Sequence, residues 1–354
     1  MNEEKICTLC GKCLDACPVF NLTLREDLSP KSKLFLIDLF KQHRFEAKDI
    51  EKLAGICLSC GRCAYACPYN IEVYEVIWRF KNSNPTWKNW IWSKIVASLP
   101  IISSFKTILP SSFHFFLNYK SQSWLKVLKI SKRFDKKVLI FPGCIGNFIK
   151  KDWKDKARSL LLLAGYEVVG EVKECCSFPY LSIGLFDEAL LCQKKIVSLW
   201  RSLKEPLIVV FCGTCYFTLK EKIEKRLFSK RELKTWKDSV YLLWDLFEIL
   251  DYELNKDYLY KKKIALHIPC HLLKEDFYWF DNILKLEKID SCCGFGGSMY
   301  LENKEIVEKF ATHFWEKKKK WDEIFSFCSG CVIQLNYKIP KNKKAYHFLD
   351  TIQL

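Results

Sequence analysis

Two stretches near the N-terminus share one pattern of cysteines. Residues 7–18 read CTLCGKCLDACP, and residues 57–68 read CLSCGRCAYACP. In each, three cysteines stand three positions apart, and a fourth follows four positions later, directly before a proline. Three thiolates at this spacing can hold one [4Fe–4S] cubane, while the cysteine before the proline reaches the other cluster. The pattern therefore predicts two cubanes that are held by crossed sets of ligands.

The crossed pattern assigns a ligand role to all eight cysteines. Structural zinc sites also use CxxC pairs. They do not need a third cysteine at the same spacing followed by xxxCP, so iron is favoured over zinc. The predicted ligands of one cluster are Cys7, Cys10, Cys13 and Cys67, and those of the other are Cys57, Cys60, Cys63 and Cys17.

The residues between the two motifs have the pattern of helices. Apolar side chains recur through residues 33–54, Ser29-Pro30 is a typical helix start, and Gly55 is a typical stop. With this helical insert, residues 1–80 resemble a bacterial-type two-cluster ferredoxin, as found at the front of many respiratory iron–sulfur subunits. The resemblance implies a small α-rich module that carries single electrons between partners.

The composition is that of a folded protein rich in thiols. The 354 residues include 19 cysteines, the apolar fraction is 49%, and 57 Lys or Arg against 41 Asp or Glu give a net charge of +16. This excludes a disordered or collagen-like chain. The N-terminus has no apolar signal segment, so we expect a cytoplasmic protein. Disulfides are disfavoured there, and an odd number of cysteines cannot all pair, which favours metal ligation.

No membrane span is expected. The best candidate, residues 90–109, is interrupted by Lys94, Pro100 and Lys106. It lies within a basic, aromatic connector at residues 81–137, which holds 11 Lys or Arg and a single acidic residue. Prolines are expected to cut this connector into short helices. Its aromatic residues can pack over the N-terminal module, or the connector can contact an acidic partner or the inner face of the cell membrane. Nucleic-acid binding is disfavoured because no base-reading motif is present.

Ten further cysteines form two matching sets of five. From the double cysteine to the following CxxC pair the step is 36 residues in one set and 35 in the other, which indicates an internal duplication. The first set is Cys144, Cys175, Cys176, Cys212 and Cys215, and the second is Cys270, Cys292, Cys293, Cys328 and Cys331.

The surroundings of these cysteines repeat as well. Short apolar runs at residues 138–141, 207–211, 264–268 and 324–327 end just before a cysteine, and longer helical patterns such as 153–164 and 186–200 separate them. Such runs predict buried parallel strands, whose carboxyl ends are where open α/β sheets place ligands. We therefore predict two duplicated, doubly wound α/β domains, at residues 138–260 and 261–354.

The two sets resemble the cysteine-rich CCG domains of the heterodisulfide reductase family. The whole chain is similar to the fused D-type subunits of that family, and also to iron–sulfur subunits of glycolate oxidase, of lactate utilisation and of anaerobic glycerol-3-phosphate dehydrogenase. The resemblance implies that the ten cysteines hold one or two non-cubane [4Fe–4S] clusters.

The first set departs from the family pattern at one position. Gly294 follows the second double cysteine, whereas Ser177 follows the first. Glycine there allows a positive φ and a close approach of the backbone, so serine puts the geometry of the first site in doubt. Cys212 and Cys215 are both intact, and this favours the heterodisulfide-reductase branch over the glycolate-oxidase type.

Three residues near these motifs receive other roles. Cys192, on an apolar helical pattern, is interpreted as a small buried hydrophobe. His267 and His271, on either side of Cys270, are interpreted as hydrogen-bond partners at a strand end rather than as ligands.

The chain carries no GxGxxG, GxxxxGK[ST], GxSxG or HExxH motif, so a partner such as a flavoprotein or a cytochrome subunit is expected to exchange electrons with it. We expect an iron–sulfur oxidoreductase subunit whose cubanes pass electrons to the CCG clusters, which reduce a disulfide or a similar acceptor. The alternative is a conduit from a flavin-dependent 2-hydroxy-acid or glycerol-3-phosphate dehydrogenase to membrane quinone. A DNA-associated iron–sulfur protein rests on net charge alone and is disfavoured.

Overall fold

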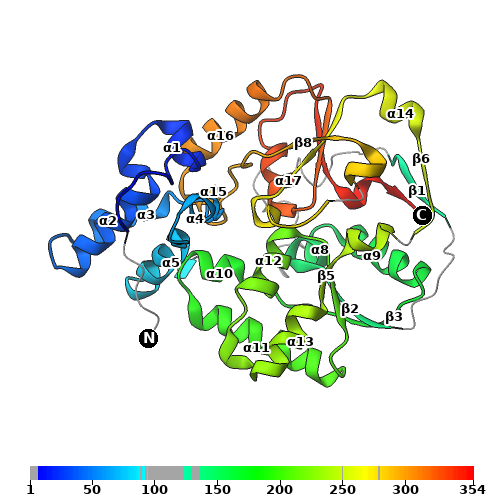
Figure 1. The fold of residues 1–354 in the computed structure, drawn as a ribbon, viewed down its shortest axis with the longest axis horizontal. Coiled ribbons are helices and arrows are strands. Elements are labelled where there is room, and N and C mark those ends of the chain that lie inside the picture. Colours follow the sequence, from blue (N-terminus) through cyan, green and yellow to red (C-terminus); the bar gives the residue numbers. More distant parts are fainter. Residues whose placement is uncertain are drawn as a thin grey trace.

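A computed structural model describes residues 7–87, 90–91, 94, 123–128, 136–248, 250–277 and 280–354 of the chain. Most of the connector predicted at residues 81–137 lies outside the described residues, so its short helices stay a prediction. The helical N-terminal module lies at one end of the molecule, next to two α/β parts that are drawn in green and in yellow to red (Figure 1).

Five helices build the N-terminal module, as the sequence pattern predicts for its α-rich character. The Ser29 hydroxyl caps α2 by accepting a hydrogen bond from the Ser32 backbone N–H at 3.3 Å, and α3 ends at Gly55. The predicted start and stop are thus confirmed, although residues 42–46 divide the region into two helices. The helices are α1 (Pro18–Thr23), α2 (Pro30–Lys41), α3 (Ala47–Gly55), α4 (Arg62–Ala66) and α5 (Val73–Ser83).

The first α/β part is a four-stranded parallel sheet with the order β3-β2-β4-β5. Its strands are β2 (Lys137–Phe141), β3 (Glu167–Glu171), β4 (Leu207–Val210) and β5 (Val240–Leu242). Its helices are α8 (Gly143–Phe148), α9 (Lys151–Leu163), α10 (Phe178–Ser182), α11 (Phe186–Ser202), α12 (Gly213–Glu221) and α13 (Lys230–Ser239).

The second α/β part repeats this arrangement with the order β8-β7-β9-β10, again entirely parallel. Its strands are β7 (Ile264–His267), β8 (Glu287–Ile289), β9 (Glu323–Ser326) and β10 (Lys344–His347). Its helices are α14 (Lys256–Lys261), α15 (Met299–Glu302), α16 (Lys304–Lys317) and α17 (Ser329–Asn336). The four predicted strands are all present, and the matching strand orders support the internal duplication.

A third, smaller sheet was not expected from the sequence. It joins β1 (Leu125–Val127), β6 (Tyr252–Leu254) and β11 (Ile352–Gln353) in the order β11-β1-β6. Strand β1 falls inside the connector for which only helices were predicted, so that interpretation is wrong for these three residues. The reason is tertiary: β1 pairs with strands more than a hundred residues later, which local periodicity cannot reveal.

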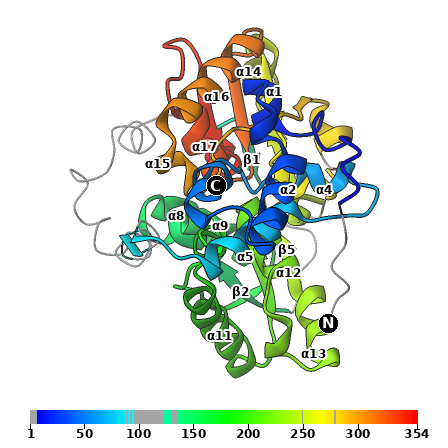
Figure 2. The same cartoon turned by 90° about the vertical axis from the view of Figure 1, so that its left-hand side faces the viewer.

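The two α/β parts share one continuous apolar core. Aromatic rings fill much of it, and the Gly213 backbone N–H donates a hydrogen bond to the Phe327 carbonyl at 2.7 Å, which joins the ends of β4 and β9. Figure 2 shows the two parts above one another with the N-terminal module alongside both. Among the described residues, no helix has the length and apolar character needed to cross a membrane.

Candidate functional site

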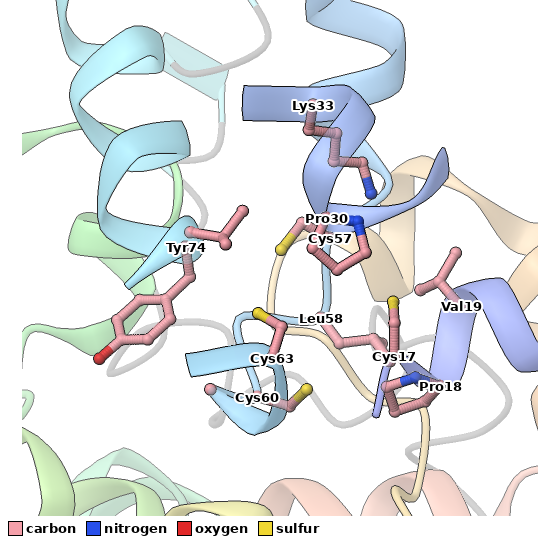
Figure 3. Close-up of a pocket in the computed structure, with 12 residues that line it drawn as sticks. Cys17, Pro18, Val19, Pro30, Lys33, Cys57, Leu58, Cys60, Cys63 and Tyr74 are labelled. Atoms are coloured by element: carbon pink, nitrogen blue, oxygen red, sulfur yellow. The ribbon is translucent and has the colours of Figure 1, made fainter. Parts of the chain in front are cut away.

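The N-terminal module encloses a cavity with cysteines from both motifs. Cys17, which directly precedes α1, lines it together with Cys57, Cys60 and Cys63 from the second motif. Figure 3 shows these four side chains around the cavity, with Cys17 on the opposite side from Cys57 and Cys63. A thiolate set of this kind suits iron in a cluster.

A second cavity in the same module contains the remaining cysteines of the two motifs. Cys7, Cys10 and Cys13 line it together with Cys67. Cys63 lines both cavities, so the two sets of thiols share one wall. Four cysteines thus line the first cavity and five line the second, with Cys63 common to both, and their binding to iron stays a prediction.

The two cysteine loops have the same backbone conformation. Gly11 and Gly61 stand at matched positions with φ of +81° and +73°, and two positions earlier Leu9 and Ser59 have φ of 56° and 50°. Glycine adopts the left-handed region without a steric cost, whereas leucine and serine adopt it only where the surrounding loop requires it. Each loop thus folds its three thiols toward one cavity by the same two turns.

One buried cation lies at the cavity of Cys17. Lys33 in α2 is 3% exposed, and its Nζ donates hydrogen bonds to the backbone carbonyls of Leu28 at 2.8 Å and Ile56 at 2.6 Å. Burial raises the pKa of Cys17 to about 11, and the charge of Lys33 acts in the opposite direction. The lysine therefore favours negative charge in this cavity.

The ten remaining motif cysteines lie just past the carboxyl ends of parallel strands. Cys144 follows β2, the pair Cys175 and Cys176 follows β3, and Cys212 follows β4. The second part repeats this placement, with Cys270 after β7, Cys292 and Cys293 after β8, and Cys328 after β9. This is the edge at which open α/β sheets bind ligands.

The ten thiols form one continuous network of side-chain contacts. Cys293 Sγ and Cys331 Sγ are 3.2 Å apart, and the contact between Cys212 and Cys328 joins the two sets of five. The Cys60 thiol of the N-terminal module contacts Cys292, which connects the network to the first cavity. In order, the connected thiols are Cys144, Cys175, Cys176, Cys215, Cys212, Cys328, Cys331, Cys293, Cys292 and Cys270.

Hydroxyl groups bind thiols across the boundary between the two α/β parts. Thr214 Oγ1, inside the first CxxC pair, lies 3.3 Å from Cys328 Sγ. Ser329 Oγ, inside the second pair, lies 3.2 Å from Cys212 Sγ. Each CxxC pair thus supplies a hydrogen bond to the first cysteine of the other, which fixes the two pairs face to face.

Within each double pair, the second cysteine is the one whose thiolate is stabilised. Hydrogen bonds from Cys175 and Cys215 lower the pKa of Cys176 well below its usual value, and the Phe178 backbone N–H contributes. Hydrogen bonds from Cys292 and Cys331 lower the pKa of Cys293 in the same way. Thiolates are the form that binds metal. Within the described residues, no group of three or more His, Cys, Asp or Glu side chains is arranged to hold a single metal ion.

Comparison with known proteins matches the two kinds of cysteine pattern to two domain families. The 4Fe-4S dicluster domain matches residues 6–71. The cysteine-rich domain, CCG, matches residues 138–220 and again residues 264–336. The chain therefore contains a 4Fe-4S dicluster domain followed by two cysteine-rich CCG domains. The resemblance predicted from the cysteine spacing is thereby confirmed, and the chain is an iron–sulfur protein.

One relative of this dicluster and CCG protein is a subunit of the fumarate reductase (CoM/CoB) of Methanothermobacter marburgensis. It is 23% identical over 216 residues, which cover 57% of this chain and 42% of the relative. The chain therefore spans about two-fifths of that relative's length.

The serine in the first CCG motif keeps the conformation of the glycine in the second. Ser177 has φ of 78° and Gly294 has φ of 85°. The Ser177 side chain is fully buried, and its hydroxyl accepts a hydrogen bond from Gln193 Nε2 at 2.8 Å. Gln193 Oε1 in turn accepts from the Glu224 backbone N–H at 2.7 Å. The doubt raised by Ser177 is thus resolved for the backbone, because the left-handed turn is retained.

The two histidines of the second CCG domain are hydrogen-bond partners, as predicted. His267 Nε2 lies 2.9 Å from the Ser291 carbonyl, and burial lowers the pKa of His267 to about 4. His271 Nε2 lies 3.0 Å from the Ser59 carbonyl of the dicluster domain, and its Nδ1 lies 3.1 Å from Thr214 Oγ1 of the first CCG domain. Since a carbonyl only accepts, Nε2 carries the proton in both rings. His271 therefore connects all three domains.

Several residues of the site carried no usable sequence signal. Lys33 is one lysine among several in a predicted helix, and Gln193 lies on an ordinary amphipathic helix. Thr214 lies inside a CxxC pair, so the sequence alone places it next to a thiol. Its hydrogen-bond partner in the other domain, Cys328, could not be predicted. Cys192, half-buried in α11, lies outside the thiol network.

Proposed function

We propose that this chain is the iron–sulfur subunit of a reductase, and that it passes electrons from two cubanes to clusters on the CCG cysteines, where a disulfide or a similar two-electron acceptor is reduced. The observation that carries the proposal is the unbroken series of thiol contacts from Cys60 through Cys292 to Cys328 and Cys212. Iron–sulfur clusters supply one-electron transfer, and two facing sets of thiolates suit a two-electron acceptor.

The proposed ligand sets follow the cavities and strand ends. Cys7, Cys10, Cys13 and Cys67 would hold one cubane, and Cys17, Cys57, Cys60 and Cys63 the other. The two sets of five would hold one or two further clusters. This assignment uses the predicted domain boundaries at residues 80, 137 and 260.

A doubly wound arrangement of each CCG domain supports the proposal. The strand order in each sheet places the first strand between the second and the third, so the order reverses between β2 and β4 and between β7 and β9. Ligands of doubly wound sheets bind at this reversal. Cys144 and Cys212 stand at the first reversal, and Cys270 and Cys328 stand at the second.

This chain's own residues would organise the site in two ways. The hydroxyls of Thr214 and Ser329 orient the facing CxxC pairs. His271 positions the Thr214 hydroxyl through a hydrogen bond at Nδ1. The His271 ring is itself held by stacking on Phe217, with ring centroids 4.6 Å apart and an interplanar angle of 6°. A redox partner such as a flavoprotein or a cytochrome subunit would supply the electrons.

A second candidate is an electron conduit from a flavin-dependent dehydrogenase to membrane quinone. An exposed aromatic patch just past α5 favours it: Trp87 is 70% exposed, Trp90 is 63% exposed, and Lys94 Nζ lies 5.5 Å from the Trp90 ring centroid. Aromatic residues next to lysines bind anionic bilayer surfaces. This patch would place the protein peripherally on the inner face of the membrane.

Iron analysis of anaerobically purified protein tests the first proposal. Two cubanes account for about eight irons per chain, so iron clearly above eight supports clusters on the CCG cysteines, and eight or fewer contradicts them. Reduction of a disulfide by the dithionite-reduced protein tests the reaction itself. Flotation with anionic vesicles that is lost at high salt would favour the conduit instead.

A further inference from the structure

A large cavity lies between the dicluster domain and the second CCG domain. Its volume is about 730 Å³, which is within the usual size of small-molecule sites. Its walls come from α1, α4, the segments at residues 273–274 and 290–292, and the C-terminal half of α16. Figures 1 and 2 both show α1 close to α16. The cavity is thus separate from the face between the two CCG domains.

Three lysines line this cavity without neutralising partners. Among the described residues, none of Lys274, Lys317 and Lys318 forms an ion pair with a carboxylate. Lys274 Nζ lies 5.0 Å from the ring centroid of Tyr65, which also lines the cavity. The aromatic ring therefore holds this ammonium group at the wall.

The acidic residues of the cavity do not cancel this charge. Asp290 is paired with Arg62, which also lines the cavity. Asp15 is the other lining carboxylate. With Arg62 and Asp290 neutralising each other, three lysines face one carboxylate, so the cavity has an excess of positive charge that attracts anions.

Two buried polar atoms of lining residues have no hydrogen-bond partner within the described residues. They are Arg62 Nε and Ser291 Oγ. Buried polar groups are nearly always paired, and an unpaired one calls for a bound water, ion or ligand. Both residues flank Cys292, which lines the cavity and whose thiol contacts Cys60.

We propose that this cavity binds a small organic dianion in contact with the Cys292 edge of the second CCG domain. Lys317 and Lys318 would bind one anionic group near the end of α16, and Lys274 the other. Anion binding does not rest on the proposed function, whereas reduction of the bound dianion does, with the proposed cluster at Cys292, rather than the two facing sets together, as the electron donor.

Two isosteric probes separate these two claims. Suberate is a redox-inert dicarboxylate, and 3,3′-dithiodipropionate has the same length with a disulfide at its centre. We would measure suberate binding to the cluster-loaded full chain by calorimetry at low salt. We would then reduce the same protein with dithionite, remove the excess, and measure the two-electron reduction of dithiodipropionate to two molecules of 3-mercaptopropionate. If suberate binds but the disulfide is not reduced, the anion site stands and the proposed function fails.

Matched double variants on one helix provide the control. Lys317→Gln/Lys318→Gln removes two charges from the cavity wall, and we expect about tenfold weaker suberate binding. Lys304→Gln/Lys309→Gln removes two exposed charges of α16 that do not line the cavity, and we expect the wild-type affinity. Higher salt should weaken wild-type binding.

Three results would overturn the site. The first is no suberate binding to the wild-type protein at millimolar concentrations. The second is a dissociation constant for the Lys317→Gln/Lys318→Gln variant within twofold of the wild-type value. The third is equal binding of 1,8-octanediol, which has the same length without charge.

Discussion

The Cys60 thiol of the dicluster domain contacts the Cys292 thiol of the second CCG domain. Cys60 belongs to the cavity that Cys17, Cys57 and Cys63 also line, and Cys292 belongs to the ten-thiol network. The contact therefore connects the two kinds of site directly. At Cys60, the dicluster domain contacts a cysteine of the second CCG domain rather than one of the first.

Replacing Cys292 tests this connection. We expect Cys292→Ser to keep both cubane signals but to slow electron transfer out of them by about tenfold or more, because Cys292 is itself a proposed ligand of the cluster that accepts the electrons. Stopped-flow reoxidation of the reduced protein measures the rate. Cys192→Ser removes a thiol outside the network and should reoxidise at the wild-type rate. Unchanged reoxidation in Cys292→Ser would show that electrons take another path.

Exchanging the residues after the double cysteines tests the two left-handed turns. Ser177→Gly relieves a strained φ but loses the bond to Gln193, so we expect a change in unfolding free energy within about 1 kcal/mol. In Gly294→Ser, the new Cβ would collide with the Phe310 ring, and we expect a loss of about 2 to 4 kcal/mol. Anaerobic denaturant titrations followed by circular dichroism measure both values. Equal effects of the two substitutions would contradict this account.

Lys222 holds the dicluster domain against the first CCG domain. Its Nζ lies 2.8 Å from Glu72 Oε1 and 2.7 Å from Glu75 Oε1, and the lysine side chain is only 10% exposed. We expect Lys222→Met to destabilise the protein by about 1 to 3 kcal/mol, because it removes the counter-charge of Glu72 and leaves Glu75 with only the exposed Arg79, 3.6 Å away. Lys48→Met, which removes an exposed partner of Glu46, should have little effect. Thermal melts at neutral pH compare the two variants.

The same contact predicts a pH dependence. Burial raises the pKa of Glu72, but hydrogen bonds from Lys222 and Tyr74 outweigh it, and the net pKa lies below the usual 4.5. The stabilisation is thus complete above pH 4.5 and is lost as the pH falls through the lowered value. In Lys222→Met the largest influence that lowers the pKa of Glu72 is lost, while burial still raises it. The pKa of Glu72 should therefore rise, and acid unfolding should begin at a higher pH. An identical acid midpoint in both proteins would contradict this assignment.

Lys33 is expected to set the reduction potential of one cubane. Reduction adds negative charge next to its buried ammonium group, so Lys33→Met should lower the potential of the cubane at Cys17 by about 50 mV, a change of roughly 1 kcal/mol for one electron. A redox titration followed by electron paramagnetic resonance measures it. The potential of the other cubane should stay the same, as should both potentials in Lys48→Met. Equal shifts of both cubanes would indicate a general structural effect.

Much of the site was open to prediction from the sequence because ligand spacing is local. The three cysteines of a cubane loop and the glycine between them lie within seven residues, so their spacing alone indicates a shared site. The strands before Cys144 and Cys270 are short apolar runs, and their periodicity is local as well. Neither feature depends on a contact with a distant part of the chain.

Contacts between distant segments had no such signal. The sheet that joins β1, β6 and β11, the bond from Gln193 to Ser177 and the paired carboxylates around Lys222 all bring together residues that are far apart in the chain. Their side chains are common ones in common helices, and nothing in the local pattern distinguishes them from solvent-exposed neighbours.

The domain families, the duplication and the division of eighteen cysteines into motifs follow from the amino-acid sequence alone, because each of these depends on spacing within a short stretch. The contacts of Cys60 with Cys292 and of Cys212 with Cys328, and the lining of one cavity by Lys274, Lys317 and Lys318, emerge only in the folded chain. These relations depend on how the three domains pack, and packing is fixed by the complementarity of whole surfaces rather than by any one segment.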